Sequence, residues 1–177
     1  MSLQIEIKNN LLNGSITKSD FLRKLLDLDQ STLDRENCFE NIEVMESPQI
    51  KKIFETSDLE TKYNYYHNLR LFYFHAFQNE ASTFESLTKA IKHLEMANQL
   101  SDTLEEILPN EDPLFSKYIL GTLYYIKNDL NNLTLLIEDY EKGDKNDLIY
   151  SNIDRLKKLQ NNLNLYKSVD YSRDYLN

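Results

Sequence analysis

The sequence predicts an all-α protein, and three observations carry that prediction. The chain of 177 residues holds only 3 Gly and 3 Pro, fewer turn residues than an all-β domain needs. No segment alternates apolar and polar side chains with the period of two that is typical of a strand. Helix start signals, in contrast, recur along the chain. We therefore expect one all-α domain, built from antiparallel helical hairpins that stack as an irregular bundle or as a short solenoid.

The helix start signals place the expected elements in order. Residues that cap helices precede five of the apolar segments. They are Thr17 with Asp20, Ser47 ahead of Pro48, Ser57 with Glu60, Ser82 with Glu85, and Asp112 ahead of Pro113. We expect helices near residues 3–12, 17–28, 32–46, 48–56, 58–79, 83–107, 113–127, 130–142 and 146–166. Within a single domain 1–177, residues 1–56 supply N-terminal helices that pack on a helical-hairpin region at 58–166, and residues 167–177 fray.

The helix expected near 58–79 is apolar on nearly every side. Tyr63, Tyr66 and Tyr73 belong to one stripe, while Leu69 and Phe72 lie on other faces. A helix of this kind is surrounded by other helices. We expect it to be the hub on which the N-terminal helices and a later hairpin pack.

The acidic composition limits the classes of partner. The formal net charge is −9, whereas binding to a nucleic-acid backbone or to an anionic membrane relies on clustered Lys and Arg. We expect a protein or peptide partner, no nucleic acid and no membrane, and a homo-oligomer remains open. No apolar run approaches the ~18 residues of a membrane span, so a cytoplasmic location follows by default.

Signals for metals and cofactors are weak. The single cysteine, Cys38, excludes an intramolecular disulfide and a multi-cysteine metal site. Residues 13–21 resemble the second half of a calcium-binding EF-hand loop, but in the first half Leu11 stands at a ligand position and cannot coordinate calcium. Glu60, His67 and His93 lack the Glu-x-x-His spacing of di-iron bundles. We expect no cofactor and no metal site.

A glycine lies inside the apolar helix expected at 113–127. Gly in a helix interior costs about 1 kcal/mol relative to Ala, so we expect a neighbouring helix to pack closely against Gly121. Leu120 precedes this glycine, Tyr124 follows it by three residues, and Asn128-Asp129 breaks the helical pattern. This spacing is similar to that of the tetratricopeptide repeat, a helix-turn-helix unit with a period of ~34 residues.

The resemblance extends in a degenerate form over roughly residues 58–142. Ala90 and Leu94 have the spacing of the family's second helix. Leu133 and Tyr140 stand where the family prefers Ala, and larger side chains there change the distance between the two helices. Generic packing of helical hairpins explains the same pattern.

In the tetratricopeptide family the inner faces of the first helices bind extended peptides. The resemblance therefore implies a non-catalytic protein–protein interaction module with an aromatic groove. The implied partner-binding residues are Asn64, His67, Phe74, Phe115, Tyr118, Thr122 and Tyr125. Those from 115 to 125 follow each other at intervals of three, four and three, which makes one stripe on a helix. A buried core face would show the same stripe.

Two other functions fit parts of the sequence. A small, acidic, helical chain fits an immunity- or inhibitor-type protein that neutralises a basic partner. Arg70 and His75 match the Arg-x4-His spacing of HEPN-type ribonucleases, which are also all-α. Positions five apart on one helix diverge by roughly 140°, so a shared cleavage site needs a kink or a second copy. Because no phosphate-cradling glycine loop, nucleophile elbow or His-Glu-x-x-His motif occurs, we expect no enzyme.

Overall fold

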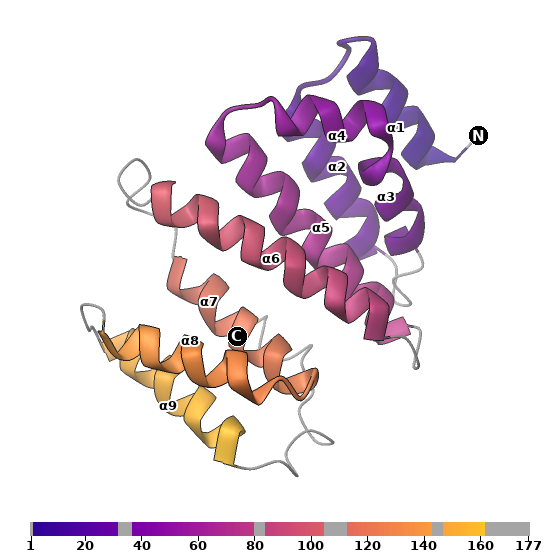
Figure 1. Cartoon of the computed structure of the whole chain (residues 1–177). Coiled ribbons are helices and arrows are strands. Elements are labelled where there is room, and N and C mark those ends of the chain that lie inside the picture. The colour runs from indigo at the N-terminus through magenta and orange to yellow at the C-terminus, as the bar shows by residue number, and fades with distance from the viewer. Residues whose placement is uncertain (1, 32–36, 80–83, 105–112, 143–146, 162–177) are drawn as a thin grey trace. The chain divides into compact units, whose positions relative to one another are not determined.

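The computed structural model describes residues 2–31, 37–79, 84–104, 113–142 and 147–161. All regular secondary structure in these residues is α-helical (Figure 1), which confirms the predicted fold class. The helices are α1 (Leu3–Leu12), α2 (Lys18–Ser31), α3 (Asn37–Glu46), α4 (Pro48–Glu55), α5 (Leu59–Asn79), α6 (Phe84–Leu104), α7 (Pro113–Ile126), α8 (Leu130–Lys142) and α9 (Asp147–Asn161). Within the described ranges, none of them combines the length and the apolar character that crossing a membrane requires.

The helices belong to two compact units, Met1–Pro113 (unit 1) and Leu114–Asn177 (unit 2). Unit 1 contains α1 to α6, and unit 2 contains α8, α9 and nearly all of α7. The sequence predicts one domain whose N-terminal helices end near residue 56. In the structure α5 and α6 belong to the same unit as α1 to α4, and the division falls at the start of α7.

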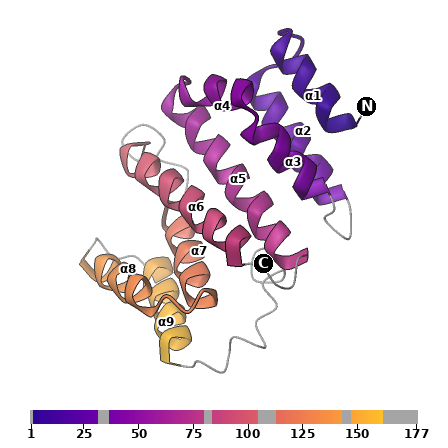
Figure 2. The same ribbon diagram turned by 45° about the vertical axis from the view of Figure 1, so that its right-hand side comes forward.

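Helix α5 is the central helix of unit 1. It packs against α2, α3, α4 and α6, and it lies between α6 and the N-terminal helices in both views (Figure 1 and Figure 2). The Tyr65 ring stacks on Phe54 of α4 with 4.8 Å between the ring centroids, and Phe54 in turn contacts Phe21 of α2. The Tyr65 hydroxyl donates to the carbonyl oxygen of Met45 in α3 (2.9 Å). These contacts confirm that the N-terminal helices pack on α5.

Three asparagine side chains bind the backbone of α2, and we call these contacts the amide row. The donors and the carbonyl oxygens that they reach are Asn68 and Leu22 (3.3 Å), Asn41 and Leu25 (2.9 Å), and Asn37 and Leu28 (2.9 Å). Because the three carbonyls are spaced three residues apart, they follow one face of α2. Asn41 is fully buried, and a buried amide without an acceptor would cost about 1–3 kcal/mol.

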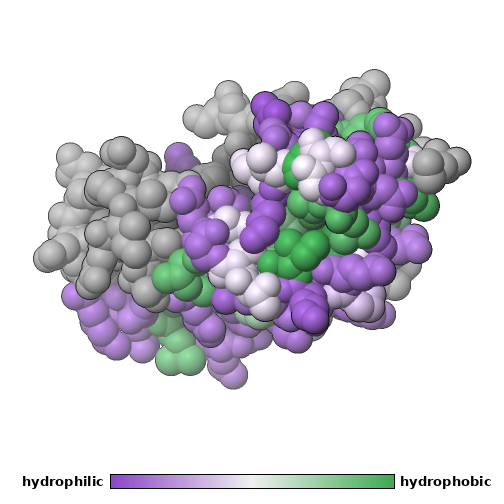
Figure 3. All heavy atoms as spheres, turned by 90° about the horizontal axis from the view of Figure 1, so that it is seen from above, coloured by the Kyte–Doolittle hydropathy of each residue, from purple (hydrophilic) through white to green (hydrophobic). Residues whose placement is uncertain are grey.

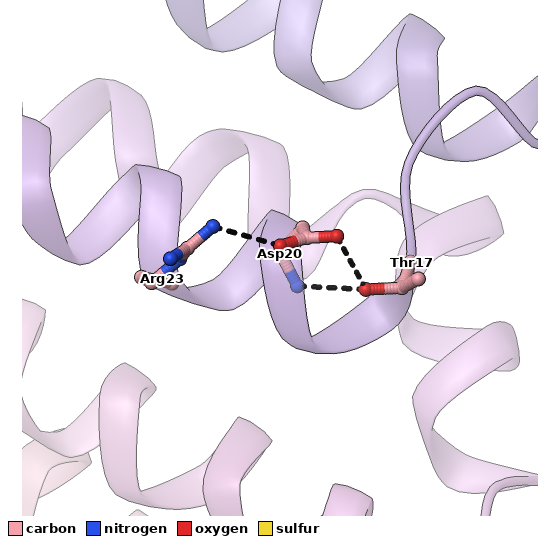
Figure 4. Close-up of polar contacts among 3 residues, drawn as sticks. All are labelled: Thr17, Asp20 and Arg23. Atoms are coloured by element: carbon pink, nitrogen blue, oxygen red, sulfur yellow. Dashed lines mark hydrogen bonds and ion pairs between the residues drawn. The ribbon is translucent and has the colours of Figure 1, made fainter.

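Capping contacts define the start of α2. The Thr17 hydroxyl accepts from the backbone N–H of Asp20 (3.0 Å) and donates to its carboxylate (2.8 Å), and Arg23 donates to the other carboxylate oxygen (2.8 Å) (Figure 4). The capping box predicted here is confirmed. The hydrogen bond from the Thr17 side chain lowers the pKa of Asp20. The Asp20 carboxylate therefore stabilises the start of α2. Gly14, at φ 77°, lies in the turn that follows α1.

The start of α5 differs from the prediction. The sequence assigns the cap to Ser57, but Asp58 carries it: its carboxylate accepts from the backbone N–H of Thr61 (2.8 Å) and from the Thr61 hydroxyl (2.9 Å). Ser57 instead donates to the carbonyl oxygen of Ile53 (2.7 Å) and accepts from the ammonium of Lys18 (2.7 Å). Since the Ser57 hydroxyl is engaged by α4 and α2, the neighbouring carboxylate takes the capping position.

In unit 2, α7 contacts two helices closely at Gly121. A Cβ atom placed on this glycine would lie 2.7 Å from a δ-carbon of Leu156 in α9 and 3.1 Å from a δ-carbon of Leu136 in α8. The predicted close helix contact is confirmed. The turn between α7 and α8 is at Asn128-Asp129, as predicted, and Asn128 adopts the left-handed conformation with φ 60°.

Replacing Gly121 by Val should destabilise unit 2 by about 1–3 kcal/mol, because a larger side chain overpacks a well-filled contact. Gly121→Ala should change stability by less, since the gain of about 1 kcal/mol in helix propensity offsets part of the clash. Urea unfolding followed by circular dichroism measures both variants. Leu156→Ala should partly rescue Gly121→Val, and a Val variant as stable as the original chain would contradict the close contact.

Candidate functional site

Three of the seven predicted partner-binding residues are buried in the structure. Phe74, Thr122 and Tyr125 are core residues, each with no more than 5 % of its surface exposed. The remaining side chains of the set are Asn64, His67 and Tyr118, which are half-buried, and Phe115, which lies outside the described side chains. Because Phe74, Thr122 and Tyr125 pack inside the protein, they offer no surface to a partner, and their assignment as partner contacts is corrected.

Arg70 and His75 do not share a site. The two side chains are only 3 % and 7 % exposed. Arg70 donates from Nη2 to Nε2 of His67 (2.9 Å). His75 contacts the carboxylate of Asp29 in α2 through Nδ1. The two side chains leave α5 toward different partners, as their separation of five positions predicts. Within one copy of the described chain, the two side chains of the ribonuclease alternative therefore do not meet at a common position.

Unit 1 has a groove between α1 and α3, which we call the α1–α3 groove. Its volume is about 720 Å³. One wall, the α1 wall, consists of Ile5, Lys8 and Asn9 of α1 with Ser2, which precedes α1. The other wall, the α3 wall, consists of Glu40, Glu43, Val44 and Glu46 of α3 with Ser47, which precedes α4. Gln4 in α1 donates from Nε2 to Oδ1 of Asn37 in α3 (3.1 Å). Since Asn37 also belongs to the amide row, this contact fixes the two walls to each other and to α2.

Apolar side chains are exposed on both helices that form the groove. Ile5 lines the groove and is 44 % exposed, and Leu12, at 43 %, lies two turns further along the same face of α1. On α3, Phe39 is 41 % exposed and lies one turn before Glu43. Figure 3 shows hydrophobic surface on one face of the molecule, bordered by hydrophilic residues. Exposed apolar surface with a polar rim is typical of interaction sites.

The α3 wall carries a row of three exposed carboxylates, Glu40, Glu43 and Glu46. Their spacing of three residues keeps them on one side of the helix, with a rise of about 4.5 Å between neighbours. Among the residues that the structure describes, Glu40 and Glu43 form no ion pair. The α1 wall contributes one cation, Lys8. The groove is therefore negative overall and attracts cationic groups.

The last carboxylate of the row is close to a half-buried histidine. Glu46 Oε1 lies 3.7 Å from Nε2 of His93 in α6. The His93 ring stacks against Tyr66 and Tyr73 of α5, with centroid distances of 6.0 and 5.5 Å. Burial lowers the pKa of His93 to about 4, although Glu46 acts in the opposite direction. Because His93 is neutral near pH 7, it leaves the negative charge of Glu46 available to the groove.

The sequence predicts no site between α1 and α3. The helical spacing of Glu40, Glu43 and Glu46 is visible in the sequence, and it predicts that the three carboxylates lie on one side of α3. The opposite wall, however, depends on the contact of Gln4 with Asn37, 33 positions apart in the chain. No local pattern predicts a contact between residues so distant in sequence.

Comparisons with protein-family models, with curated proteins and with solved structures give no match. Within the described residues, no group of three or more His, Cys, Asp or Glu side chains could hold a metal ion. The function is therefore argued from the groove and from the chemistry of its two walls.

Proposed function

We propose that this chain is a non-catalytic protein-interaction module that binds its partner at the α1–α3 groove. The observation that carries the proposal is one groove that combines an exposed apolar side chain, Ile5, with the carboxylates of Glu40 and Glu43. Apolar contact supplies affinity, and charge supplies orientation and a faster association. A tetratricopeptide-like stacking of hairpins is part of the proposal, and the close helix contact at Gly121 supports it.

The surroundings of the histidines support a non-catalytic role. A general acid or base needs a pKa near the working pH and access to the substrate. Burial, and then the charge of Arg70, lowers the pKa of His67 to about 3. His93 is held between two tyrosine rings, and His75 is paired with Asp29. Each ring thus contributes to packing inside unit 1.

A more specific candidate is an immunity- or inhibitor-type protein that neutralises a basic partner. The excess of carboxylates over cations in the groove favours this candidate, as does the net charge of −9. Both proposals use the same groove. They differ because an inhibitor abolishes an activity of its partner when it binds, whereas a scaffold does not.

A photo-crosslinking residue at Ile5 tests the proposed function. Benzoylphenylalanine at this position should form an adduct with one partner protein in an extract of the native host. The matched control is the same residue at Leu3, which is 51 % exposed on the same helix but does not line the groove. That control should give no adduct with the same protein.

The adduct should also depend on the opposite wall. Glu43→Lys should reduce its yield by about fivefold or more, because the charge reversal repels a cationic partner. Adducts of equal yield from positions 5 and 3, or no adduct from position 5, would contradict the proposed function.

A further inference from the structure

We infer that the α1–α3 groove accepts one amphipathic helix of the partner, with Lys or Arg along one edge and apolar residues on the face that enters the groove. This inference rests on the proposed function and adds the chemistry of the partner. Docking of a helix into a groove through apolar anchors is a common mode of recognition.

The apolar surface is longer than a small molecule would need. Ile5 and Leu12 lie on one face of α1, seven residues and about 10 Å apart. Phe39 is exposed on α3, and neither Leu12 nor Phe39 belongs to the lining of the groove itself. An amphipathic helix of the partner presents apolar side chains at positions i, i+3, i+4 and i+7. The interval from i to i+7 equals the seven residues that separate Ile5 from Leu12. An elongated, apolar face therefore fits along the groove.

The row of carboxylates specifies the edge of that helix. Glu40, Glu43 and Glu46 extend over about 9 Å along α3. Basic residues one turn apart on a helix are separated by about 5.4 Å, so two or three of them fall within reach of the row. Among the described residues Glu40 and Glu43 form no ion pair, and Lys8 of the opposite wall is the one cation in the groove lining. A partner with Lys or Arg on this edge fits the groove, and one with Asp or Glu is repelled.

Other occupants fit the charges less well. A nucleic acid would bring phosphates against the carboxylates of Glu40, Glu43 and Glu46. A second copy of this chain also carries a net charge of −9, so association of two copies brings like charges together. The structure therefore favours a basic segment from a different protein.

Model peptides test the inference with the full chain. The probe is a fluorescently labelled amphipathic helix of about 18 residues, made of Leu and Lys, since helices of this length form in water. One control peptide has the same composition in an order without amphipathic character, and a second has Glu in place of Lys. Fluorescence anisotropy at two salt concentrations should show binding of the probe, weaker binding at high salt, and weaker binding of both controls.

Matched triple variants separate binding in the groove from unspecific attraction. Glu40→Gln, Glu43→Gln and Glu46→Gln together should weaken binding of the probe by about tenfold. The control combines Glu60→Gln, Glu85→Gln and Glu138→Gln, which removes the same charge from exposed positions outside the groove. This control should weaken binding less than twofold, and circular dichroism checks that both variants are folded.

A local signal adds a second readout. The imidazole resonances of His93 should shift when the probe binds, because its Nε2 lies 3.7 Å from Glu46. Equal losses in the two triple variants, equal binding of the reordered peptide, or a self-association of the chain that Ile5→Asp abolishes would each overturn the inference. An adduct at Ile5 with a partner that lacks a basic helix would overturn the inference alone and leave the proposed function intact.

Discussion

Replacing Asp29 by Ala should lower the free energy of unfolding of unit 1 by about 3–5 kcal/mol. The carboxylate of Asp29 in α2 contacts Nδ1 of His75 in α5, and Asp29 is fully buried. Its second oxygen, Oδ1, is buried without a hydrogen-bond partner among the described residues. Removal of one member of such a pair leaves the other polar group unpaired in the interior. Chemical denaturation at neutral pH, followed by circular dichroism, measures the loss.

Two further variants show whether the loss of stability in Asp29→Ala comes from the broken contact with His75 or from the space that the shorter side chain leaves. Asp29→Asn keeps an acceptor oxygen for the ring and should lose less stability than Asp29→Ala. Glu55→Ala, which breaks the exposed pair of Glu55 with Lys51, should cost less than about 1 kcal/mol. If Asp29→Ala costs no more than Glu55→Ala, the buried pair does not stabilise α2 on α5.

Unit 1 should unfold in acid, with stability lost as the pH falls from about 6.5 toward 3. His67 and His93 have pKa values of about 3 and about 4, below the ordinary value of 6.5. Burial is the main cause in both cases. Between these values and 6.5 the unfolded chain binds more protons than the folded chain, so acid favours unfolding. A shift of one pKa unit corresponds to about 1.4 kcal/mol of stability. The stability lost through the pKa shifts of both rings is therefore comparable with the free energy of unfolding of a typical protein, about 5–15 kcal/mol.

Variants of the two histidines test the cause of the acid unfolding. His93→Phe keeps a ring between Tyr66 and Tyr73 but cannot be protonated, so its stability should depend less on pH. His67→Gln should act in the same direction. The measurement is urea unfolding at pH 7.5 and at pH 5. An unchanged difference between the two pH values in His93→Phe would show that His93 does not drive the transition.

The start and end of most helices were predictable because they depend on neighbours in sequence. The bond between Thr17 and Asp20 and the turn at Asn128-Asp129 are local, and both lie where the sequence places them. The sequence pattern predicts the cap of α5 one residue too early, because Lys18 of another helix engages the hydroxyl of Ser57. Ser47, predicted to cap α4, makes no capping bond with its side chain and donates instead to the carbonyl oxygen of Val44. Local patterns therefore predict helix ends well, except where another acceptor or donor engages the capping group.

The candidate site was less predictable, because it depends on contacts between residues that are distant in sequence. Tyr118, Thr122 and Tyr125 have a spacing that suits a groove and a core face equally, and only the burial of Thr122 and Tyr125 distinguishes the two. His75 contacts a residue 46 positions away. The periodicity of apolar residues predicts which face of a helix is buried, but it does not predict which other helix covers that face.

The amide row has a consequence for the selectivity of the α1–α3 groove. Apolar packing has no direction and allows a helix to slide or rotate by a turn, whereas Asn37, Asn41 and Asn68 lock α2 in a single register against α3 and α5. Since Asn37 also bonds to Gln4, α1 and α3 are held in place before any partner arrives. The groove is thus pre-organised, and under our proposal the pitch of a partner's own charges, rather than an adjustment of the site, selects that partner.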